Sequence, residues 1–403
     1  MASTFEQFQA LLDGLDQAVA TKTQQLQDAA AKLVVAQTEA DALRAQLADA
    51  NSQNASLQVL VSALNKQVAD LQAQLAAYQN VRPTGAGFVG YETLPKQTTM
   101  TATLAQVPAG TQVTFDTGSF TFSGFDTNGY GVFPYGLVGF RGNGRTKTLF
   151  SMVPKSSTSA SRVPAQSTKS TNPLWLFRFG GNSSKPVAVK IDNLTINGTD
   201  QGHLYNGMQL YWATGSTVDK VSVTGIPGDN SANPGETFSI GTYNGNNLTF
   251  TNCDIDGRDA TGKIVGASGI GLNFNQNVTI TDSVIHHRNW GAAVTAYKCS
   301  GELVYRNLTL TDNALYALNF EENSNGNVTI DKCNFVRTGN SELCVDSSVG
   351  SLKVTIIDPI FDGPKLRIKV HADYNGLPQK QLKSDIVVIV NGVARPDLIQ
   401  WLS

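Results

Sequence analysis

A stripe of apolar residues runs through the first eighty residues at alternating steps of three and four. It begins at Phe5 and ends at Tyr78, and its only polar members are Lys22 and Asn54. A mean period of 3.5 residues kept this long makes helices supercoil around one another. A lone helix could not bury so narrow a seam, so we expect a coiled-coil oligomer. The residues that we expect to hold it together are Leu26, Leu33, Leu43, Leu47, Asn54, Leu57, Val61, Leu64, Val68 and Leu71.

The predicted helical stalk would be about 110 Å long at a rise of 1.5 Å per residue. It contains one glycine, Gly14, and no proline before Pro83, where we expect the helix to have ended. Asn54 falls at an a position, where a buried amide typically fixes register at a cost in stability. The heptads leave the number of chains open. The alternative interpretation is a long solvated helix that packs its apolar face on the rest of its own chain.

Composition argues against several classes of function. The formal net charge of −2 and the pI of about 6.1 disfavour a nucleic-acid partner bound by bulk electrostatics. No apolar run approaches the roughly 20 residues of a membrane span. The N-terminal MASTFEQFQ lacks the basic and apolar regions of a secretory signal, so we expect assembly in a cytoplasm. The cysteines show no CxxC or zinc spacing, and no HExxH, P-loop or dinucleotide fingerprint occurs, so we expect no metal and no cofactor. We expect reduced, buried thiols at Cys253, Cys299, Cys333 and Cys344.

From about residue 100 the sequence changes to strand-like alternation with an internal repeat. The pattern apolar-x-apolar-x-x-small/apolar-x-apolar is met at 189–196, 248–255, 278–285, 303–310 and 328–335. A second apolar strand lies between successive copies, as in GMQLYW, SGIGLNF and YALNFEE. Two short strands every 24–32 residues predict a parallel β-helix, in which each coil buries its apolar residues against the next. A propeller blade would need about 40–45 residues, and a leucine-rich repeat would show regularly spaced leucines and asparagines and a helix. Neither pattern fits.

Stacking of coils predicts which residues share a position along the axis. Cys253 and Cys333 fall in one inward column but lie three coils apart, too far for a disulfide. Asn247, Asn277 and Asn327 precede the same strand in three coils. We therefore interpret them as an asparagine ladder at a turn rather than as glycan acceptors.

These patterns divide the chain into a coiled-coil stalk (1–80), a linker (81–100), a parallel β-helix (101–362) and a C-terminal β cap (363–403). A cap is expected because an open β-helix end presents unpaired backbone and bare core. LRIKVHADYNG and SDIVVIVNG look like a hairpin or paired strands. Trp401 could pack on this cap or on a neighbouring subunit.

An N-terminal coiled coil joined to a β-helix resembles the tail fibres and tailspikes of bacteriophages. The segments VPAGTQVTFDTGSFTF and GLVGFRGNGRTKTLF are similar to the first coils of the pectate-lyase-like superfamily. The resemblance covers about residues 104–360 in fold and 5–80 in architecture, and it implies a right-handed helix and a homotrimer. The Ala/Gln/Asp-rich stalk and the Gly/Thr/Asn-rich body also resemble a minor tail protein of an actinobacterial phage. The superfamily includes lyases, hydrolases, epimerases and non-catalytic adhesins, so the resemblance implies no single activity.

One predicted column of the second strands carries side chains suited to binding glycans. It lies three residues beyond the central apolar position and should face outward, because inward residues alternate with it. Aromatic faces stack on sugar C–H surfaces, whereas carboxylates and amides accept hydrogen bonds from hydroxyl groups. The alternative is a stripe that is polar because it is wet or because it faces the next subunit. The predicted carbohydrate-binding residues are Tyr211, Tyr243, Asn273, Tyr297, Glu321 and Asp346.

A second group of polar residues follows the strand VTITDSVI. Its sequence HHRN, residues 286–289, resembles the basic turns of β-helix lyases, which usually add a calcium site. Asp254 and Asp282 nevertheless fall in different repeat columns, so we do not expect them to join Asp256 in coordinating a metal ion. We interpret the two histidines as surface residues, with a contact patch beside Trp290 as the alternative.

The leading hypothesis is a fibre or spike subunit on the tail or capsid surface of a phage virion. Its stalk would bind other virion proteins, and its β-helix would bind a glycan of the host cell surface. The alternatives are a tailspike depolymerase, hydrolase or lyase, that cleaves host surface polysaccharide, and a head fibre that decorates the capsid. A bacterial surface adhesin is disfavoured by the missing export signal. We lean towards a protein that is not an enzyme.

Overall fold

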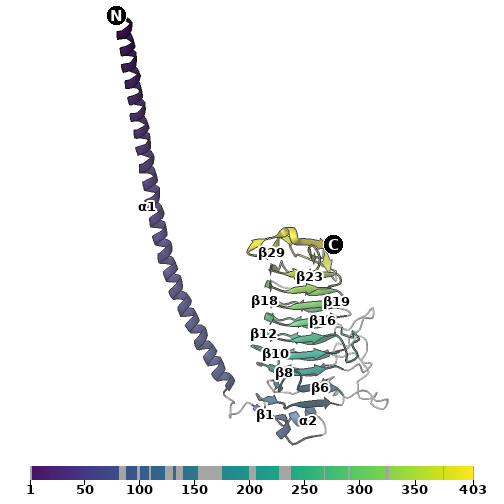
Figure 1. Ribbon diagram of the computed structural model, residues 1–403. Helices are drawn as coiled ribbons and strands as arrows, with labels where there is room; N and C mark the ends of the chain where they lie inside the picture. The colour runs from purple at the N-terminus through teal and green to yellow at the C-terminus, as the bar shows by residue number, and fades with distance from the viewer. Residues whose placement is uncertain are drawn as a thin grey trace. The chain divides into compact units, whose positions relative to one another are not determined.

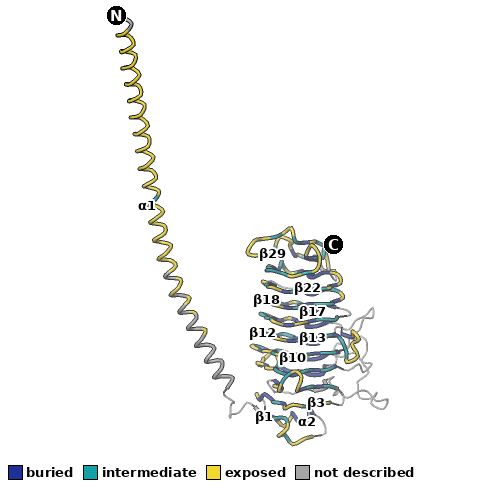
Figure 2. The backbone as a smooth tube through the Cα atoms, viewed as in Figure 1, coloured by how far each residue is buried: buried dark blue, intermediate teal, exposed yellow. Residues whose placement is uncertain are grey.

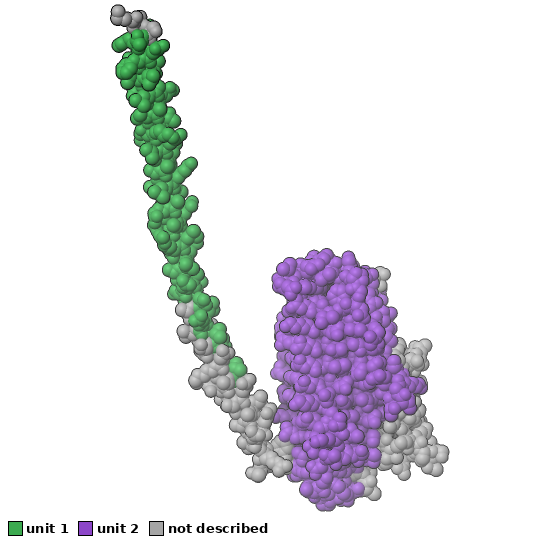
Figure 3. Space-filling view, in the orientation of Figure 1, with its two compact units in different colours: residues 1–82 green, residues 83–403 purple. Residues whose placement is uncertain are grey.

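The computed structural model divides into two compact units, residues 1–82 and 83–403 (Figure 3). The first unit is one helix, and the second consists of short strands joined by turns. The structure describes residues 2–80, 88–97, 100–108, 110–122, 130–132, 139–152, 175–198, 206–226, 237–266, 268–288, 291–322, 326–374 and 376–402.

The first unit is a single α-helix, α1, from Ala2 to Asn80 (Figure 1). The large apolar side chains of its seam are exposed wherever the structure describes them, for example Leu26 at 70% and Leu43 at 64% (Figure 2). The side chain of Leu71 lies outside the described residues. A helix in a protein gains most of its stability from packing an apolar face, so we expect this seam to pack against another helix. No helix in the described part of the chain combines the length and the apolar character that crossing a membrane requires.

The second unit is a parallel β-helix, right-handed as parallel crossovers almost always are. Three stacks of strands run along its axis (Figure 1). The first stack consists of β1 (Phe88–Gly90), β2 (Gln112–Thr114), β5 (Gly139–Arg141), β8 (Lys190–Asn197), β10 (Thr217–Thr224), β12 (Asn246–Thr251), β15 (Gln276–Thr281), β18 (Ser300–Arg306), β21 (Gly326–Asp331), β24 (Lys353–Ile357) and β29 (Ile386–Val390).

The second stack is a separate 10-stranded sheet. It consists of β4 (Tyr130–Val132), β7 (Trp175–Gly180), β9 (Asn206–Tyr211), β11 (Phe238–Tyr243), β14 (Ser268–Asn273), β17 (Ala292–Tyr297), β20 (Tyr316–Glu321), β23 (Ser341–Val345), β26 (Leu366–Lys369) and β31 (Ile399–Leu402). The third stack shares β8 and β10 with the first. Its other members are β3 (Gly118–Phe122), β6 (Thr148–Met152), β13 (Asp254–Asp256), β16 (Val284–Arg288), β19 (Thr309–Asn313), β22 (Asn334–Val336) and β25 (Ile360–Phe361).

A bend separates the first stack from the third in each later coil. The bend residue adopts a left-handed backbone, with φ of 53° at Asn252 and 52° at both Asp282 and Asn307. Each of these residues donates its backbone N–H to a carbonyl of the following coil, as Asn252 does to Thr281 at 3.3 Å. Asparagine and aspartate tolerate this conformation better than bulky residues. The bend thereby turns the chain without leaving an unpaired N–H.

The core places like residues above like, as the repeat predicted. Met208, Ile240, Ile270, Val294 and Leu318 pair in sequence along the second stack, and each is at most 1% exposed. All four cysteines are free and buried, and Cys253 lies beside Ser283 in an inward column. Near the N-terminal coils the core is aromatic, with rings in mutual contact at Phe115, Phe140, Phe150, Phe177 and Phe179.

The asparagine ladder is shorter than predicted. Asn247 and Asn277 occupy equivalent turn positions, with φ of 54° and 55°. In the next coil a bulge brings Gly301 and Glu302 to this place, so Asn327 lies over Glu302 rather than over another asparagine. Its Nδ2 donates to Glu302 Oε1 at 2.6 Å.

The parallel stacks extend beyond the predicted range 101–362. β1 pairs with β2 inside the expected linker, although residues 81–87 lie outside the described residues. In the expected cap, β26, β29 and β31 continue the parallel pairing. Their backbone groups form hydrogen bonds with strands that would otherwise be unpaired edges. Two antiparallel pairs, β29 with β30 (Val393–Ala394) and β27 (Asp373–Tyr374) with β28 (Leu377–Pro378), then end the pattern.

Both ends of the core are covered. At the first coil, α2 (Met100–Leu104) packs Met100 and Leu104 against the core, next to a short 3-10 turn at Tyr91–Thr93. At the last coil, Trp401 packs on the core, and Lys383 Nζ of the 3-10 turn Lys383–Asp385 lies 5.2 Å from the centre of its ring. A further 3-10 turn spans Pro396–Leu398. Both covers protect apolar side chains that an open coil would expose to water.

Candidate functional site

The predicted carbohydrate-binding residues do share one column at the ends of the second-stack strands. Strand pairing aligns each of them with its counterpart in the next coil, and Asp346 follows Val345, which pairs with Phe320. We call these residues the tyrosine column: Tyr211, Tyr243, Asn273, Tyr297, Glu321 and Asp346.

The predicted outward exposure is correct for part of the column only. Tyr211, Tyr297 and Glu321 are partly exposed, whereas Asn273 is 6% exposed and Asp346 is fully buried. The expectation is wrong for Asp346 because the chain after β26 folds over it: the backbone N–H of His371 donates to Asp346 Oδ1 at 2.8 Å. Glu321 and Asp346 therefore do not form a pair of accessible carboxylates.

A second column, which the sequence did not reveal, lies directly beside the first. We call it the turn column: Trp212, Asn244, Phe274, Lys298 and Glu322, all with a left-handed backbone. The N–H groups of the first four donate to carbonyls of the tyrosine column in the following coil. These residues are recognised by their place just after each strand and by their turn conformation. The sequence repeat describes apolar strand positions only, so it could not reveal them.

The two columns together form two aromatic clusters. In one, the guanidinium of Arg178 lies 4.3 Å from the ring centre of Tyr211, which also contacts the rings of Trp212 and Tyr243. In the other, Phe274 meets Tyr297 edge to face at 5.4 Å, and Lys298 Nζ lies 4.8 Å from the Tyr297 ring centre. The aromatic rings could stack on the C–H surface of a sugar, and the neighbouring charged and polar groups could form hydrogen bonds with its hydroxyl groups.

The backbone makes the aromatic members of the turn column costly. Trp212 has φ of 48° and Phe274 has φ of 56°, in a region that costs a residue with a side chain about 1–2 kcal/mol. Asn244, at the equivalent position with φ of 53°, is a residue type that tolerates this conformation. The turn imposes the same backbone on Lys298 and Glu322, so the strain comes from the stacking of the coils, and asparagine is the residue type that would relieve it.

The outer face of the second stack also buries polar atoms without partners. Gln209 Oε1, Asn273 Nδ2 and Asn319 Oδ1 have no hydrogen-bond partner among the described residues, and the three side chains are 6–7% exposed. An unpaired buried polar atom costs about 1–3 kcal/mol. Such atoms are satisfied when a water molecule or a ligand hydroxyl reaches them.

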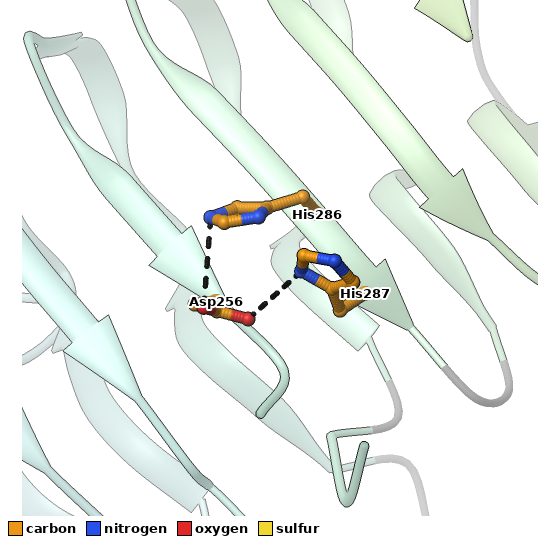
Figure 4. Close-up of side chains that lie close together, drawn as sticks. All are labelled: Asp256, His286 and His287. Atoms are coloured by element: carbon orange, nitrogen blue, oxygen red, sulfur yellow. Dashed lines mark hydrogen bonds and ion pairs between the residues drawn. The ribbon is translucent and has the colours of Figure 1, made fainter. Parts of the chain in front are cut away.

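A different group of polar side chains lies on the third stack. We call Asp254, Asp256, His286, His287 and Asp312 the acid–imidazole cluster. Figure 4 shows its central members, Asp256 and the two histidines. His286 Nε2 lies 3.1 Å from Asp254 Oδ1 and 4.0 Å from Asp256 Oδ2. His287 joins Asp256 at 3.1 Å through Nδ1 and Asp312 at 3.6 Å through Nε2. The cluster thus spans three consecutive coils.

The two histidines, which we interpreted as surface residues, are partly buried. The side chains of His286 and His287 are only 16% and 20% exposed, and Arg288 is 1% exposed. Asn289 and Trp290 lie outside the described residues. The separation of Asp254 from Asp282 is confirmed: Asp254 pairs with Val284, whereas Asp282 lies at a bend.

Arginine side chains set the charge of the cluster. Burial opposes ionisation of Asp256, but hydrogen bonds from Arg258 and the nearby His286 hold its pKa below the usual value. Hydrogen bonds from Arg337 likewise lower the pKa of Asp312. Burial lowers the pKa of His287 despite the attraction of Asp256, so its imidazole stays neutral at neutral pH.

The cluster is better suited to proton transfer than to holding a metal. One ligand atom each from Asp256, His286 and His287 lies within 4.8 Å of the others. However, Arg258 occupies both carboxylate oxygens of Asp256, with Nη2 2.7 Å from Oδ2 and Nε 3.2 Å from Oδ1. Asp254 is the more accessible carboxylate, with 43% of its side chain exposed, beside the imidazole of His286. A carboxylate next to an imidazole is able to hold or move a proton.

Arg288 connects this region to the second stack. Its Nη1 donates to Ser239 Oγ at 3.0 Å and to the Ser268 carbonyl at 3.3 Å, and its Nη2 donates to the Ile255 carbonyl at 2.8 Å. Burial lowers the pKa of Arg288 to about 10. This side chain holds β16 against the second stack and places the two histidines before it in the chain.

No known protein family and no curated protein matches the sequence. Among solved structures, the chain is similar to the catalytic domain of a GH87 α-1,3-glucanase, at 12% identity and a TM-score of 0.39 over 78% of this chain and 59% of that one. It is also similar to ORF18 of Geobacillus virus E2, at 12% identity and a TM-score of 0.33 over 78% and 66%. A third similar structure is the A-module of a mannuronan C-5 epimerase from Azotobacter vinelandii, at 12% identity and a TM-score of 0.28 over 75% and 94%. The chain thus spans less than two thirds of the glucanase domain and of the viral protein, and scores this low support no argument about function.

Proposed function

We propose that this chain is a subunit of a phage virion fibre or spike, a tail fibre or minor tail protein, that binds a glycan of the host surface. The stalk joins several copies, by the family resemblance three, and attaches them to other virion proteins. The outer face of the second stack holds the glycan, and the particle carries the protein on its tail or its capsid. A head fibre on the capsid is the same proposal with a different point of attachment.

The observation that carries glycan binding is the repetition of similar groups along the axis. Tyr211, Tyr243 and Tyr297 stand in register, flanked by Arg178 and Lys298. Adjacent coils lie about 4.8 Å apart. A polysaccharide laid along the axis would therefore meet aromatic faces and hydrogen-bonding groups at regular intervals.

The stalk supports the oligomeric part of the proposal. Its seam keeps Leu33 at 69% and Val61 at 53% exposed in the single chain. These side chains are buried when parallel helices pair through the a and d positions. Asn54, on the same seam, would fix the register of the strands of the coiled coil.

The test of glycan binding uses the full-length protein and purified cell-wall glycan of the host. Tyr297→Ala and Glu321→Ala should each weaken binding, and the same substitutions in the virion should reduce adsorption to the host cell. Phe274→Asn should also weaken binding while stabilising the fold by about 1 kcal/mol, because asparagine tolerates the left-handed backbone. The matched control is Ile360→Asn, which changes an apolar side chain that is 60% exposed on the third stack.

The outcomes separate binding from folding. Weaker binding in a variant that melts at the same or a higher temperature supports the proposal. Unchanged binding in Tyr297→Ala, Glu321→Ala and Phe274→Asn together would remove this face as the glycan site.

A second candidate function is cleavage of the glycan, which the acid–imidazole cluster favours. Asp254 and His286 on adjacent coils place an accessible carboxylate 3.1 Å from an imidazole. Incubation of the protein with host polysaccharide should then produce new reducing ends or unsaturated sugars. Asp254→Asn should abolish the products, whereas Tyr297→Ala should only raise the substrate concentration needed. Absence of any product from the wild-type protein argues for binding alone.

A further inference from the structure

A thiol, a carboxylate and an imidazole meet on the outer face of the second stack near its C-terminal end. Cys344 lies in β23, Asp346 directly follows that strand, and His371 follows β26 in the next coil. Cys344 Sγ lies 3.3 Å from Asp346 Oδ2, and His371 Nε2 lies 3.8 Å from the same oxygen. Their ligand atoms all lie within 4.8 Å of one another.

We propose that Cys344, Asp346 and His371 bind a divalent zinc ion. A tetrahedral zinc ion with bonds of about 2.3 Å to sulfur, 2.0–2.1 Å to nitrogen and 2.0–2.2 Å to oxygen separates its ligand atoms by roughly 3.4–3.6 Å. The distances of 3.3 and 3.8 Å bracket this range. The ligand set also matches the preference of zinc for thiolate and imidazole together with one carboxylate.

Cys344 differs from the other three cysteines in what it contacts. Cys253, Cys299 and Cys333 belong to the core and donate their thiols to backbone carbonyls. Cys344 is equally buried but lies outside the core, and its thiol contacts a carboxylate. Its strand neighbours in the adjacent coils are the polar residues Asn319 and Lys369, in contrast to the apolar surroundings of the core thiols.

A metal ion would compensate a buried carboxylate at this position. Asp346 is fully buried, and His371 Nε2 lies 3.8 Å from its Oδ2. Lys369 is the strand neighbour of Cys344 in the next coil, so a cation bound here would have to compete with its charge. Zinc binds cysteine as the thiolate, so the bound ion would displace the proton of Cys344.

The acid–imidazole cluster provides the contrast. There an arginine already neutralises Asp256, with Arg258 Nη2 2.7 Å from Oδ2. At Cys344, among the described residues, Asp346 accepts hydrogen bonds from the thiol and from the backbone N–H of His371, and its ion-pair partner is the His371 imidazole. The position therefore retains carboxylate lone pairs for a metal ion.

Metal binding at this place would join two consecutive coils. Cys344 and Asp346 belong to the coil of β23, and His371 belongs to the coil of β26. The Cys344 S–H bond breaks, its proton passes to solvent, and the thiolate sulfur forms the bond to zinc. A fourth position would stay open beside His371, whose side chain is 24% exposed.

The experiment titrates the metal-free full-length protein with Co²⁺, a coloured substitute for Zn²⁺. One equivalent per chain should produce thiolate-to-cobalt charge-transfer absorption, which Zn²⁺ then displaces with release of cobalt. Zn²⁺ should raise the melting temperature of the β-helix and EDTA should lower it again. The absorption should disappear in Cys344→Ser, and the affinity should fall in His371→Gln by more than the roughly 10–100-fold expected for a residue that only orients a ligand.

Two further variants keep the outcome interpretable. Asp346→Asn removes the buried charge while keeping the size of the side chain, so the metal-free protein should remain folded but lose the metal-induced rise in melting temperature. Cys333→Ser, a core thiol outside the proposed site, should keep the absorption. No thiolate absorption in the wild-type protein, or full absorption in Cys344→Ser, would overturn the zinc site. Neither result depends on whether the protein binds glycan.

Discussion

In α1 the backbone hydrogen bonds are local and the large apolar side chains of the seam are exposed. In the β-helix each strand bonds to the coils before and after it, and apolar side chains such as Phe150 and Phe250 are fully buried. The β-helix therefore buries its apolar side chains within one chain. The stalk lacks a partner for its seam within its own unit, so its stability should come from other copies. Dilution should unfold the stalk and leave the β-helix intact, because only association depends on concentration.

The largest effect is expected from a substitution in the seam of the stalk. Leu33 and Val34 are neighbours with nearly equal exposure, 69% and 66%, but only Leu33 belongs to the seam. Leu33→Asp should reduce the proposed oligomer to single chains, because it would place a charge in the seam of every chain of the proposed coiled coil. Val34→Asp, the matched control, should leave the mass in sedimentation equilibrium unchanged. Equal masses for both variants would mean that the seam does not hold the chains together.

The next largest effect is expected in the core of the β-helix. Phe250→Ala removes a fully buried ring from β12 and should destabilise the β-helix by about 3–5 kcal/mol. Denaturant unfolding followed by tyrosine and tryptophan fluorescence measures this loss. The helical signal of the stalk in circular dichroism should keep its own midpoint. A common shift of both transitions would show that the two units unfold together.

Acid should act on the β-helix through the acid–imidazole cluster, with a smaller effect. The pKa of His287 is lowered by burial, so its contribution is present above about pH 6.5 and is lost as the pH falls through the folded-state value. Arg337 lowers the pKa of Asp312, so that contribution is present above about pH 4 and is lost at still lower pH. Urea unfolding across this range should show both losses. His287→Gln should remove the first loss and keep the second, and an unchanged pH profile in this variant would contradict the assignment.

The smallest effect is expected for an ion pair between coils at the surface. Arg306 Nε lies 2.8 Å from Asp331 Oδ2, with 51% of the arginine side chain exposed. Arg306→Ala should cost about 0.2–1 kcal/mol, less at high salt, because solvent screens the pair. A loss comparable to that of Phe250→Ala would show that charges between coils, rather than the core, stabilise the stack.

The register of the second stack could be predicted because its central apolar residues, such as Ile270 and Val294, repeat at nearly constant spacing. The same spacing located the tyrosine column. The burial of Asp346 could not be predicted, since His371 reaches it from a coil where the repeat has ended. Trp212 and Phe274 were missed because their significance lies in a left-handed backbone that residue type does not reveal. The sequence singled out the histidines and the aspartates of β13, but their meeting with Asp312 could not be predicted, because the cluster joins three coils whose connecting turns differ in length.

The spacing of the coils also has a consequence for how the chain folds. Partners in adjacent coils are separated by about one coil of sequence, as in the pairs Arg306–Asp331 and Asn307–Asp282, each 25 residues apart. Over a β-helix of this size such separations give a relative contact order of roughly 0.1, a value typical of helical proteins that fold quickly. Each finished coil offers a ready edge on which the next can form, so folding can begin at several places and spread. Adding coils should then lengthen the protein without increasing the sequence separation that each new strand must close to pair with its neighbour.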